Sequence, residues 1–155
     1  MVKTSDEFFM GLALEEAKRA FEQEEVPVGA VLVIDGQLIS SAHNQVEKTQ
    51  DASQHAEMNC LRIASQNRRN WRLNEATLYC TLEPCAMCLG AMLLFRVKKL
   101  VWGAPDFRHG ANGSICDLMA DKHPIHRVEV SRGVRGEESA ALLKEFFKIR
   151  RKTNV

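Results

Sequence analysis

Two short motifs constrain this chain more than any other feature of its sequence. The first reads His55-x-Glu57, and the second reads Pro84-Cys85-x-x-Cys88. Together they offer one imidazole and two thiols, the ligand set of a zinc site with three protein ligands. A catalytic zinc ion keeps its fourth position open for water, and a nearby carboxylate can take that water's proton. Glu57 is such a carboxylate, and a purely structural zinc site would have no need of it.

The second motif predicts the start of a helix. Pro84 suits a helix entry, because the donor that proline lacks would be unpaired there anyway. Cys85 and Cys88 then lie on the same side of the first turn, where the positive end of the helix lowers the pKa of a thiol. His55 and Glu57 are two residues apart and diverge on a regular helix. They can serve one metal ion only where a turn, such as a helix start, presents both.

Each motif alone is weak. A lone Cys-x-x-Cys is also typical of a structural zinc site or a redox pair, and a lone His-x-Glu indicates nothing specific. Their combination resembles the signature of zinc-dependent nucleobase deaminases. We therefore expect one Zn²⁺ per subunit, held by His55, Cys85 and Cys88, with Glu57 as the catalytic residue. Zinc is preferred over other divalent metals because thiolates are soft ligands.

The length of 155 residues fits a single domain, 1–155, with a core of about 5–151. Hydrophobic residues make up 45% of the chain and charged residues 26%, which is ordinary for a globular protein. No apolar run is long enough to span a membrane, and no signal peptide is visible. The odd number of cysteines argues against a disulfide scaffold, so we expect a reducing, cytoplasmic location. We expect Cys60, Cys80 and Cys116 to be small buried residues.

The net charge of +1 does not indicate a nucleic-acid partner, but the basic residues are clustered. They are either solvated helix faces or a rim that contacts phosphates, and the sequence leaves both readings open. The clusters are Arg62, Arg68, Arg69 and Arg72, with no acid between them, and Lys144, Lys148, Arg150, Arg151 and Lys152 at the C-terminal end.

Apolar periodicity and turn residues predict the order helix, hairpin, helix, strand, helix, strand, strand, helix. The expected elements are a helix from Ser5 through Phe21, strands at 26–34 and 37–42 joined by Asp35-Gly36, a loop at 43–54, a helix at 55–66, a basic loop at 67–74, a strand at 77–81, a helix from Pro84 through Phe95, a strand at 97–102, a loop over the site at 103–114, a short helical turn at 116–120, a strand at 128–130 and a helix at 137–151. Helices that alternate with strands predict a mixed sheet covered on both faces.

Over about Glu7–Arg151 the chain resembles the bacterial tRNA-specific adenosine deaminases. The cysteine segment alone indicates the wider cytidine-deaminase-like superfamily, and the Asp106 segment and the C-terminal segment narrow the resemblance. The matching segments are Pro27-Val28-Gly29-Ala30-Val31, His55-Ala56-Glu57, Thr81-Leu82-Glu83-Pro84-Cys85-x-Met87-Cys88-x-Gly90-Ala91-Met92, Gly103-Ala104-x-Asp106, Gly110-Ala111-x-Gly113-Ser114 and Phe146-Phe147-x-x-Arg150-Arg151.

The resemblance implies a three-layer α/β/α fold with a five-stranded mixed sheet, and a homodimer. It implies a hydrolase of an amidine C–N bond that converts the wobble adenosine of the ACG anticodon of a tRNA-Arg to inosine. Zinc-bound hydroxide would attack C6 of adenine, with Glu57 as the proton shuttle. The expected partner is a tRNA anticodon stem-loop, with no membrane and no DNA.

The resemblance also implies roles for residues outside the metal site. Asn44 would contact the flipped nucleoside, and the residues that would hold the anticodon loop are Asp106, Arg108, Phe147 and Arg151. Val28 is a candidate for the pocket wall, and the backbone of Leu82 and Glu83 for contact with the amino group of the base. Phe107-Arg108-His109 is bulkier than is usual for the family at that place. His109 is either a further zinc ligand or, as we prefer, a surface residue.

Two other functions remain open. A zinc deaminase of a free nucleoside, nucleotide or nucleobase, of the cytidine or guanine type, needs the same zinc and the same glutamate. RNA dependence with steep salt sensitivity would separate it from a tRNA enzyme. A non-catalytic RNA-binding module with structural zinc is the third possibility. Glu57 argues against this module, as does the lack of an obvious fourth ligand.

Overall fold

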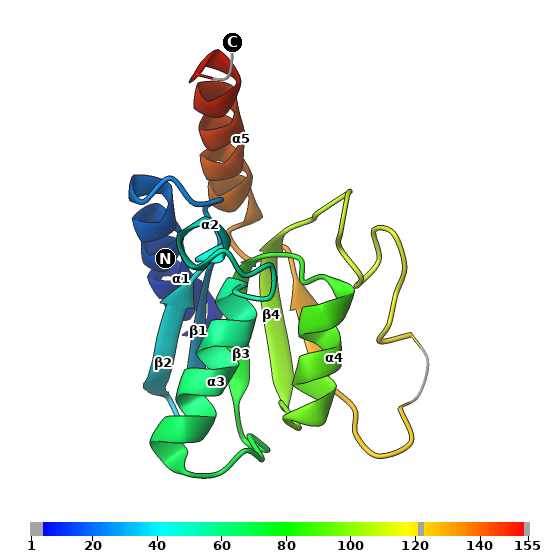
Figure 1. Cartoon of the computed structure of the whole chain (residues 1–155). Coiled ribbons are helices and arrows are strands. Elements are labelled where there is room, and N and C mark those ends of the chain that lie inside the picture. Colours follow the sequence, from blue (N-terminus) through cyan, green and yellow to red (C-terminus); the bar gives the residue numbers. More distant parts are fainter. Residues whose placement is uncertain (1–4, 121–122, 154–155) are drawn as a thin grey trace.

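A five-stranded sheet forms the centre of the protein (Figure 1). The computed structural model describes residues 5–120 and 123–153. The strands follow the order β2-β1-β3-β4-β5 across the sheet, and β3, β4 and β5 are parallel while β1 is antiparallel to both of its neighbours. Their bounds are β1 Gly29–Ile34, β2 Gln37–His43, β3 Thr77–Leu82, β4 Lys99–Ala104 and β5 Glu129–Arg132.

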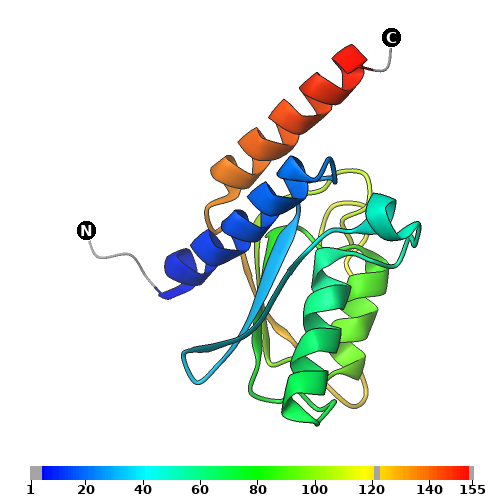
Figure 2. The ribbon, with the colours of Figure 1, turned by 60° about the vertical axis from the view of Figure 1, so that its left-hand side comes forward.

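Helices cover both faces of this sheet. The helices α1 (Ser5–Glu22) and α5 (Gly136–Thr153) lie side by side on one face, and α3 (Ala56–Arg68) and α4 (Ala86–Leu94) lie on the other (Figures 1 and 2). A fifth helix, α2 (Val46–Thr49), is a single turn that follows β2. The predicted three-layer α/β/α arrangement with a five-stranded mixed sheet is confirmed.

The strand β1 is buried on both faces, which explains its run of aliphatic residues. Ala30, Leu32 and Ile34 belong to the core cluster beneath α3 and α4, and Val31 and Val33 belong to the cluster beneath α1. Successive side chains of a strand point to opposite faces, so a strand between two helical layers needs apolar residues at every position.

Gly29 begins β1 where the strand passes directly beneath α1. A β-carbon at this position would overlap the α1 backbone at Ala13 and Ala17. Its N–H donates to Thr81 Oγ1 at 3.1 Å, which ties the start of β1 to β3. The absence of a side chain at Gly29 therefore permits the close packing of β1 against α1. The hairpin turn after β1 has positive φ at Asp35 (51°) and Gly36 (73°), as its sequence predicts.

Three expectations were wrong in detail. The 43–54 segment is not all loop, because it contains α2. Residues 116–120 form no helix: this stretch consists of turns and pairs with the preceding loop through an Asn112–Asp117 bridge. Cys116 is exposed instead of buried, because it lies in this irregular surface connection, whereas Cys60 and Cys80 are buried as expected. No helix among the described residues is long and apolar enough to cross a membrane.

Candidate active site

Six segments meet in a cleft at one end of the sheet. The carboxyl ends of β2, β3 and β4, the amino end of β1 and the first turns of α3 and α4 all lie at this end (Figure 1). Ligands of open α/β sheets bind outside the carboxyl ends of the strands. The helix α5 also borders the cleft, because it projects past the sheet at the same end (Figure 2). The cleft has a volume of about 1130 Å³.

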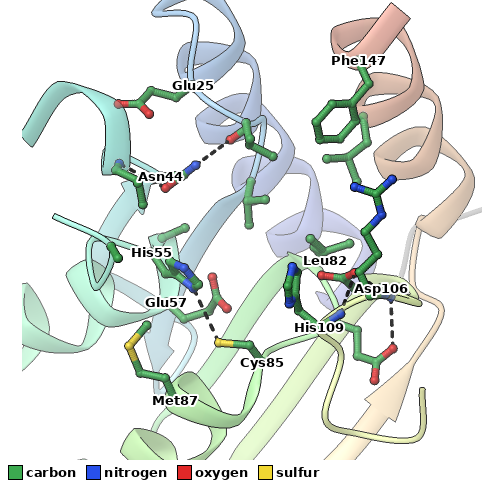
Figure 3. Close-up of a pocket in the computed structure, with 18 of the residues that line it drawn as sticks. Glu25, Asn44, His55, Glu57, Leu82, Cys85, Met87, Asp106, His109 and Phe147 are labelled. Atoms are coloured by element: carbon green, nitrogen blue, oxygen red, sulfur yellow. Dashed lines mark hydrogen bonds between the residues drawn. The ribbon is translucent and has the colours of Figure 1, made fainter. Parts of the chain in front are cut away.

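The two sequence motifs converge in this cleft because each spans the start of a helix. His55 is the N-cap residue of α3 and Cys85 is the N-cap residue of α4, both with extended backbone. Glu57 and Cys88 follow within the first turns. A helix start is the local structure in which residues 55 and 57 were expected to serve one metal ion. Figure 3 shows His55, Glu57 and Cys85 grouped on one side of the cleft.

The distances between the candidate ligand atoms fit a tetrahedral zinc ion. His55 Nδ1 lies 3.6 Å from the sulfur of Cys85 and 3.6 Å from the sulfur of Cys88. Zinc bonds of about 2.0–2.1 Å to nitrogen and about 2.3 Å to sulfur place tetrahedral N and S ligands about 3.5 Å apart. All three ligand atoms lie within 4.8 Å of one another, and among the described residues no fourth protein ligand joins them. One imidazole and two thiolates are the donor set of an open, catalytic zinc site.

The electrostatics of the site favour the metal-binding form of Cys85. A hydrogen bond from the Cys88 thiol and another from His55 lower the pKa of the Cys85 thiol to about 4, against the effect of burial. The same bond to Cys85, together with burial, raises the pKa of Cys88. The N-terminal ends of α3 and α4 both point toward the sulfur atoms, and their positive dipole ends stabilise thiolate.

Glu57 lies beside the metal ligands and is almost inaccessible to water, with 4% of its surface exposed. Burial raises the pKa of its carboxyl group, and the charge of His55 opposes this shift. A carboxylate whose charged form is disfavoured by burial is a stronger proton acceptor than an exposed one. Glu57 is therefore placed, and electrostatically suited, for proton transfer in the cleft.

Val28, Leu82 and Asn44 line the cleft, and Asn44 lies across it from Asp106 (Figure 3). Asn44 is held by the backbone on both sides of it: its Nδ2 donates to Val26 O, and its Oδ1 accepts from Val46 N, each at 3.3 Å. Asn44 is thus fixed in one orientation at the edge of the cleft (Figure 3), as a side chain that orients a substrate must be.

The loop at residues 105–114 forms the facing wall. Asp106 Oδ1 accepts from the N–H groups of Arg108 (3.1 Å) and His109 (3.2 Å), so its carboxylate caps a tight turn. Asp106, Arg108 and His109 all line the cleft. From α5, Phe147 and Arg151 line it too, one helical turn apart and on one face. His109 lies across the cleft from His55 in Figure 3, and the cluster that fits a metal ion does not include it.

Glu83 also borders the cleft, and its backbone N–H and its carboxylate are both engaged by neighbouring segments. Its backbone N–H donates to Ala104 O at 2.8 Å, continuing the pairing of β3 with β4. Its carboxylate is turned into the 105–114 loop and accepts hydrogen bonds from Asp106, Asn112 and Ser114. Burial alone would raise the pKa of this carboxyl group, but the hydrogen bonds outweigh burial and lower it.

Sequence reasoning did not single out Glu25, which also borders the cleft. Its side chain is 1% exposed, and its two carboxylate oxygens accept from Glu47 N (2.8 Å) and Lys48 N (2.9 Å) in α2. The signal in the sequence, an acid directly before a buried strand, is too common to be specific. Met87 and Phe107 also line the cleft. In the sequence, Met87 belongs to the cysteine segment and Phe107 to a bulky part of the loop, but neither pattern assigns the residue a role.

The two basic clusters lie in different parts of the molecule. Arg68 ends α3, and Arg69 and Arg72 belong to the connection from α3 to β3, at the end of the sheet opposite the cleft (Figure 1). Arg72 there stacks on Trp71, with its guanidinium carbon 4.3 Å from the ring centre. The C-terminal cluster contributes Arg150 and Arg151 to the cleft itself.

Comparisons with known proteins agree with this geometry. Residues 3–104 match the family described as the cytidine and deoxycytidylate deaminase zinc-binding region. The tRNA-specific adenosine deaminase of Bacillus subtilis is 47% identical over 149 residues, which cover 96% of this chain and 92% of that protein. The chloroplastic tRNA(adenine(34)) deaminase of Arabidopsis thaliana is 47% identical over 96% of this chain, which spans 12% of that much longer protein.

Among solved structures, one comes from biochemical and structural studies of A-to-I editing by tRNA:A34 deaminases at the wobble position of transfer RNA. It superimposes with a TM-score of 0.83 at 40% identity, covering 87% of this chain and 98% of that one.

Proposed function

The chain belongs to the cytidine and deoxycytidylate deaminase family, and from this premise we propose that it is a zinc-dependent tRNA adenosine deaminase. It hydrolyses the exocyclic C–N bond of the wobble adenosine and leaves inosine. The observation that carries this proposal is the grouping of one imidazole, two thiols and a buried glutamate at the base of an open cleft. Relatives over nearly the full length of the chain carry the same activity in their names.

The metal-binding residues are His55, Cys85 and Cys88. Zinc held by these residues supplies, when bound, a water molecule of lowered pKa that can act as nucleophile at neutral pH. The fixed N-cap positions of His55 and Cys85 orient the ligands before the substrate arrives, so no reorganisation is needed during the reaction.

Glu57 transfers the protons of the reaction. Its carboxylate carries one proton from the attacking water to N1 of adenine, and then carries the second proton, from the new hydroxyl group at C6, to the departing amine. Water adds its oxygen at C6, the bond from C6 to the amino nitrogen breaks, and ammonia leaves. The buried setting of Glu57 keeps bulk water away from these transfers.

A nucleotide within a single-stranded loop fits this cleft better than a free base does. Small-molecule sites occupy about 300–1,000 Å³ and enclose most of the ligand, whereas this cleft of about 1130 Å³ extends outward along α5 as far as Phe147 and Arg151. Phe147 and Arg151 stand on its outer wall, where an aromatic ring can stack on a base and a guanidinium can bind phosphate. A base is flipped out of a loop at lower cost than out of a duplex.

We also propose that the chain works as a homodimer and as one domain, in a reducing cytoplasm that keeps its thiols free. Support for the dimer comes from the connection between β4 and β5, which exposes Ile115 by 59%, Leu118 by 42% and Ile125 by 70%. Exposed large aliphatic side chains are common in association surfaces, and two-fold dimers are the commonest assembly.

Light scattering on a sizing column tests the dimer. The double substitution Ile115→Lys and Leu118→Lys is expected to convert a dimer to a monomer. Leu38→Lys, at a residue 48% exposed on the edge strand β2, is the control and is expected to remain dimeric. A wild-type protein that elutes as a monomer at high concentration would end this part of the proposal.

The central experiment measures inosine at the wobble adenosine of an ACG anticodon stem-loop, with zinc-loaded protein. Free adenosine, cytidine and guanine serve as parallel substrates. Inosine in the stem-loop alone supports the tRNA reading, and stem-loops with other anticodons then define which tRNA is used. Turnover of a free base or nucleoside, with none in the RNA, would keep the zinc site but assign the chain to the free-nucleoside or nucleobase deaminases.

A further inference from the structure

We propose that Glu83 is a positioning residue of this enzyme: its carboxylate holds the 105–114 loop in the shape that presents Asp106 and Arg108 to RNA. The inference rests on the proposed function and assigns Glu83 a role other than contact with the reacting base.

Both oxygens of the Glu83 carboxylate are used by the loop. Oε1 accepts from Asp106 N at 3.1 Å and from the hydroxyl group of Ser114. Oε2 accepts from Asn112 N at 2.9 Å and from Ser114 N at 3.2 Å. The donors come from both ends of the loop, so the Glu83 side chain holds the beginning of the loop at Asp106 next to its end at Asn112 and Ser114. Glu83 is 2% exposed, and water therefore does not compete for these bonds.

The loop passes over the carboxylate without space for a side chain. A β-carbon at Gly110 would overlap the Glu83 carboxyl group and would lie 2.5 Å from Asp106 O. Gly110 also forms an isolated bridge with Cys85, and Ala111 N donates to Pro84 O at 2.9 Å. Through these contacts the loop is joined directly to the segment that carries the metal ligands.

The side chains that the loop presents and those that perform the chemistry belong to different elements. Phe107, Arg108 and His109 are exposed and line the outer part of the cleft. The metal ligands and Glu57 lie at the starts of α3 and α4, outside the loop. Loss of the Glu83 carboxylate should therefore weaken RNA binding far more than it slows the chemical step.

The test is Glu83→Gln in the zinc-loaded full-length protein. Glutamine keeps the size of the side chain but turns an NH₂ group toward N–H donors that need an acceptor. We expect KM for the ACG stem-loop to rise by about tenfold, the factor that corresponds to about 1.4 kcal/mol. We expect kcat to change by less than about threefold, because a change in KM alone reports lost binding. The zinc content should stay at that of the wild type.

Glu16→Gln is the matched control. Glu16 is also a buried carboxylate, 5% exposed, but it lies on α1 and pairs with Arg19 and His43 away from the loop. Both substitutions are expected to lower the melting temperature, and only Glu83→Gln is expected to raise KM. An equal KM in the two variants would overturn the proposal, as would joint loss of kcat and zinc in Glu83→Gln.

Gly110→Ala provides a second route to the same result, because it crowds the Glu83 carboxylate without changing its charge. We expect the same rise in KM, and this variant carries the test if Glu83→Gln does not fold. Hydrogen exchange gives a readout without activity: the amides of Asp106, Asn112 and Ser114 should be protected in the wild type and exchange faster in Glu83→Gln. Unchanged exchange would overturn the proposal. A wild type inactive on the stem-loop, with the exchange result as expected, would instead refute the proposed function alone.

Discussion

His55 and Cys85 occupy the same position in two different helices, the last residue before the first turn. This position leaves the backbone extended and lets the side chain point along the helix axis into the cleft. Glu57 and Cys88 then follow on the side of the first turn that faces them. The spacing of each motif is thus explained by one local structure, the helix N-terminus, whose dipole also favours the thiolates.

We predict that Glu57→Ala keeps both the fold and the zinc but loses nearly all turnover. General acid–base catalysis contributes about 10²–10⁴-fold, and Glu57 is the acidic residue in the first turn of the helix whose N-cap residue is His55. The measurement is inosine formation in the stem-loop, alongside metal content and melting temperature. Substantial deamination by this variant would remove Glu57 from the mechanism.

Cys85→Ala is expected to lose zinc, because two ligands cannot hold the ion against water and chelators. Cys116→Ala is the control: Cys116 is exposed and lies outside the ligand cluster, so this variant should keep the metal. Metal analysis after dialysis against a weak chelator measures the difference. A full complement of zinc in Cys85→Ala would mean that the ligand assignment is wrong.

At the scale of elements, α1 packs against the face of the sheet opposite α3 and α4, which carry the candidate metal site. Its packing depends on Gly29, where the helix and strand backbones nearly touch. A second tie is a hydrogen bond at 2.7 Å from the hydroxyl group of Tyr79 on β3 to Asp6 Oδ1 at the start of α1. Burial and this bond raise the pKa of Tyr79, because both favour the neutral phenol.

The raised pKa of Tyr79 predicts a pH dependence of stability. The unfolded tyrosine ionises near pH 10, so the stability contributed by the neutral phenol is complete below about pH 10 and is lost as the pH rises further. Tyr79→Phe should be less stable than the wild type at pH 7–9, by about 0.5–1.5 kcal/mol for one hydrogen bond. The difference should shrink above about pH 10.

Denaturant unfolding at a series of pH values measures this effect. Tyr79 is the one tyrosine of the chain, so the comparison isolates a single phenol. Parallel alkaline curves for the wild type and Tyr79→Phe would contradict the prediction.

At the scale of the whole molecule, the fold places one cluster of basic residues beside the cleft and the other far from it. The C-terminal cluster rises beside the cleft on α5, and the 67–74 loop lies at the opposite end of the sheet (Figure 1). The sequence left two interpretations of the basic clusters open, solvated helix faces and a rim that contacts phosphates. Arg151 lines the cleft and can belong to such a rim, whereas within one subunit the 67–74 loop lies outside the cleft.

We predict that Arg151→Glu weakens binding of the stem-loop and reduces its salt dependence. Each phosphate contact of single-stranded nucleic acid contributes about 0.7 to the slope of log K against log salt, so the slope should fall by about that amount. Arg72→Glu makes the same charge change at the far end and should leave the slope unchanged. Binding isotherms at several salt concentrations measure both variants, and equal slopes would refute the assignment of the rim to α5.

Residue types and spacing alone determined the chemistry of this protein and the order of its elements. These features depend on a few neighbouring residues, so the sequence alone can predict them. Examples are the softness of the thiolate ligands, the stabilisation of thiolate at a helix start and the turn at Asp35 and Gly36. The single-turn helix α2, the exposed Cys116 and the turns at 116–120 were missed, because surface connections carry no periodic pattern.

Only the tertiary structure decided which segments meet. The cleft exists because parallel β3 and β4 end beside antiparallel β1, and strand pairing depends on contacts between residues far apart in sequence. The same applies to Glu83, whose position beside Pro84 says nothing of the loop that encloses it. Its partners lie more than twenty positions away, and burial among backbone donors is a property of the folded chain alone.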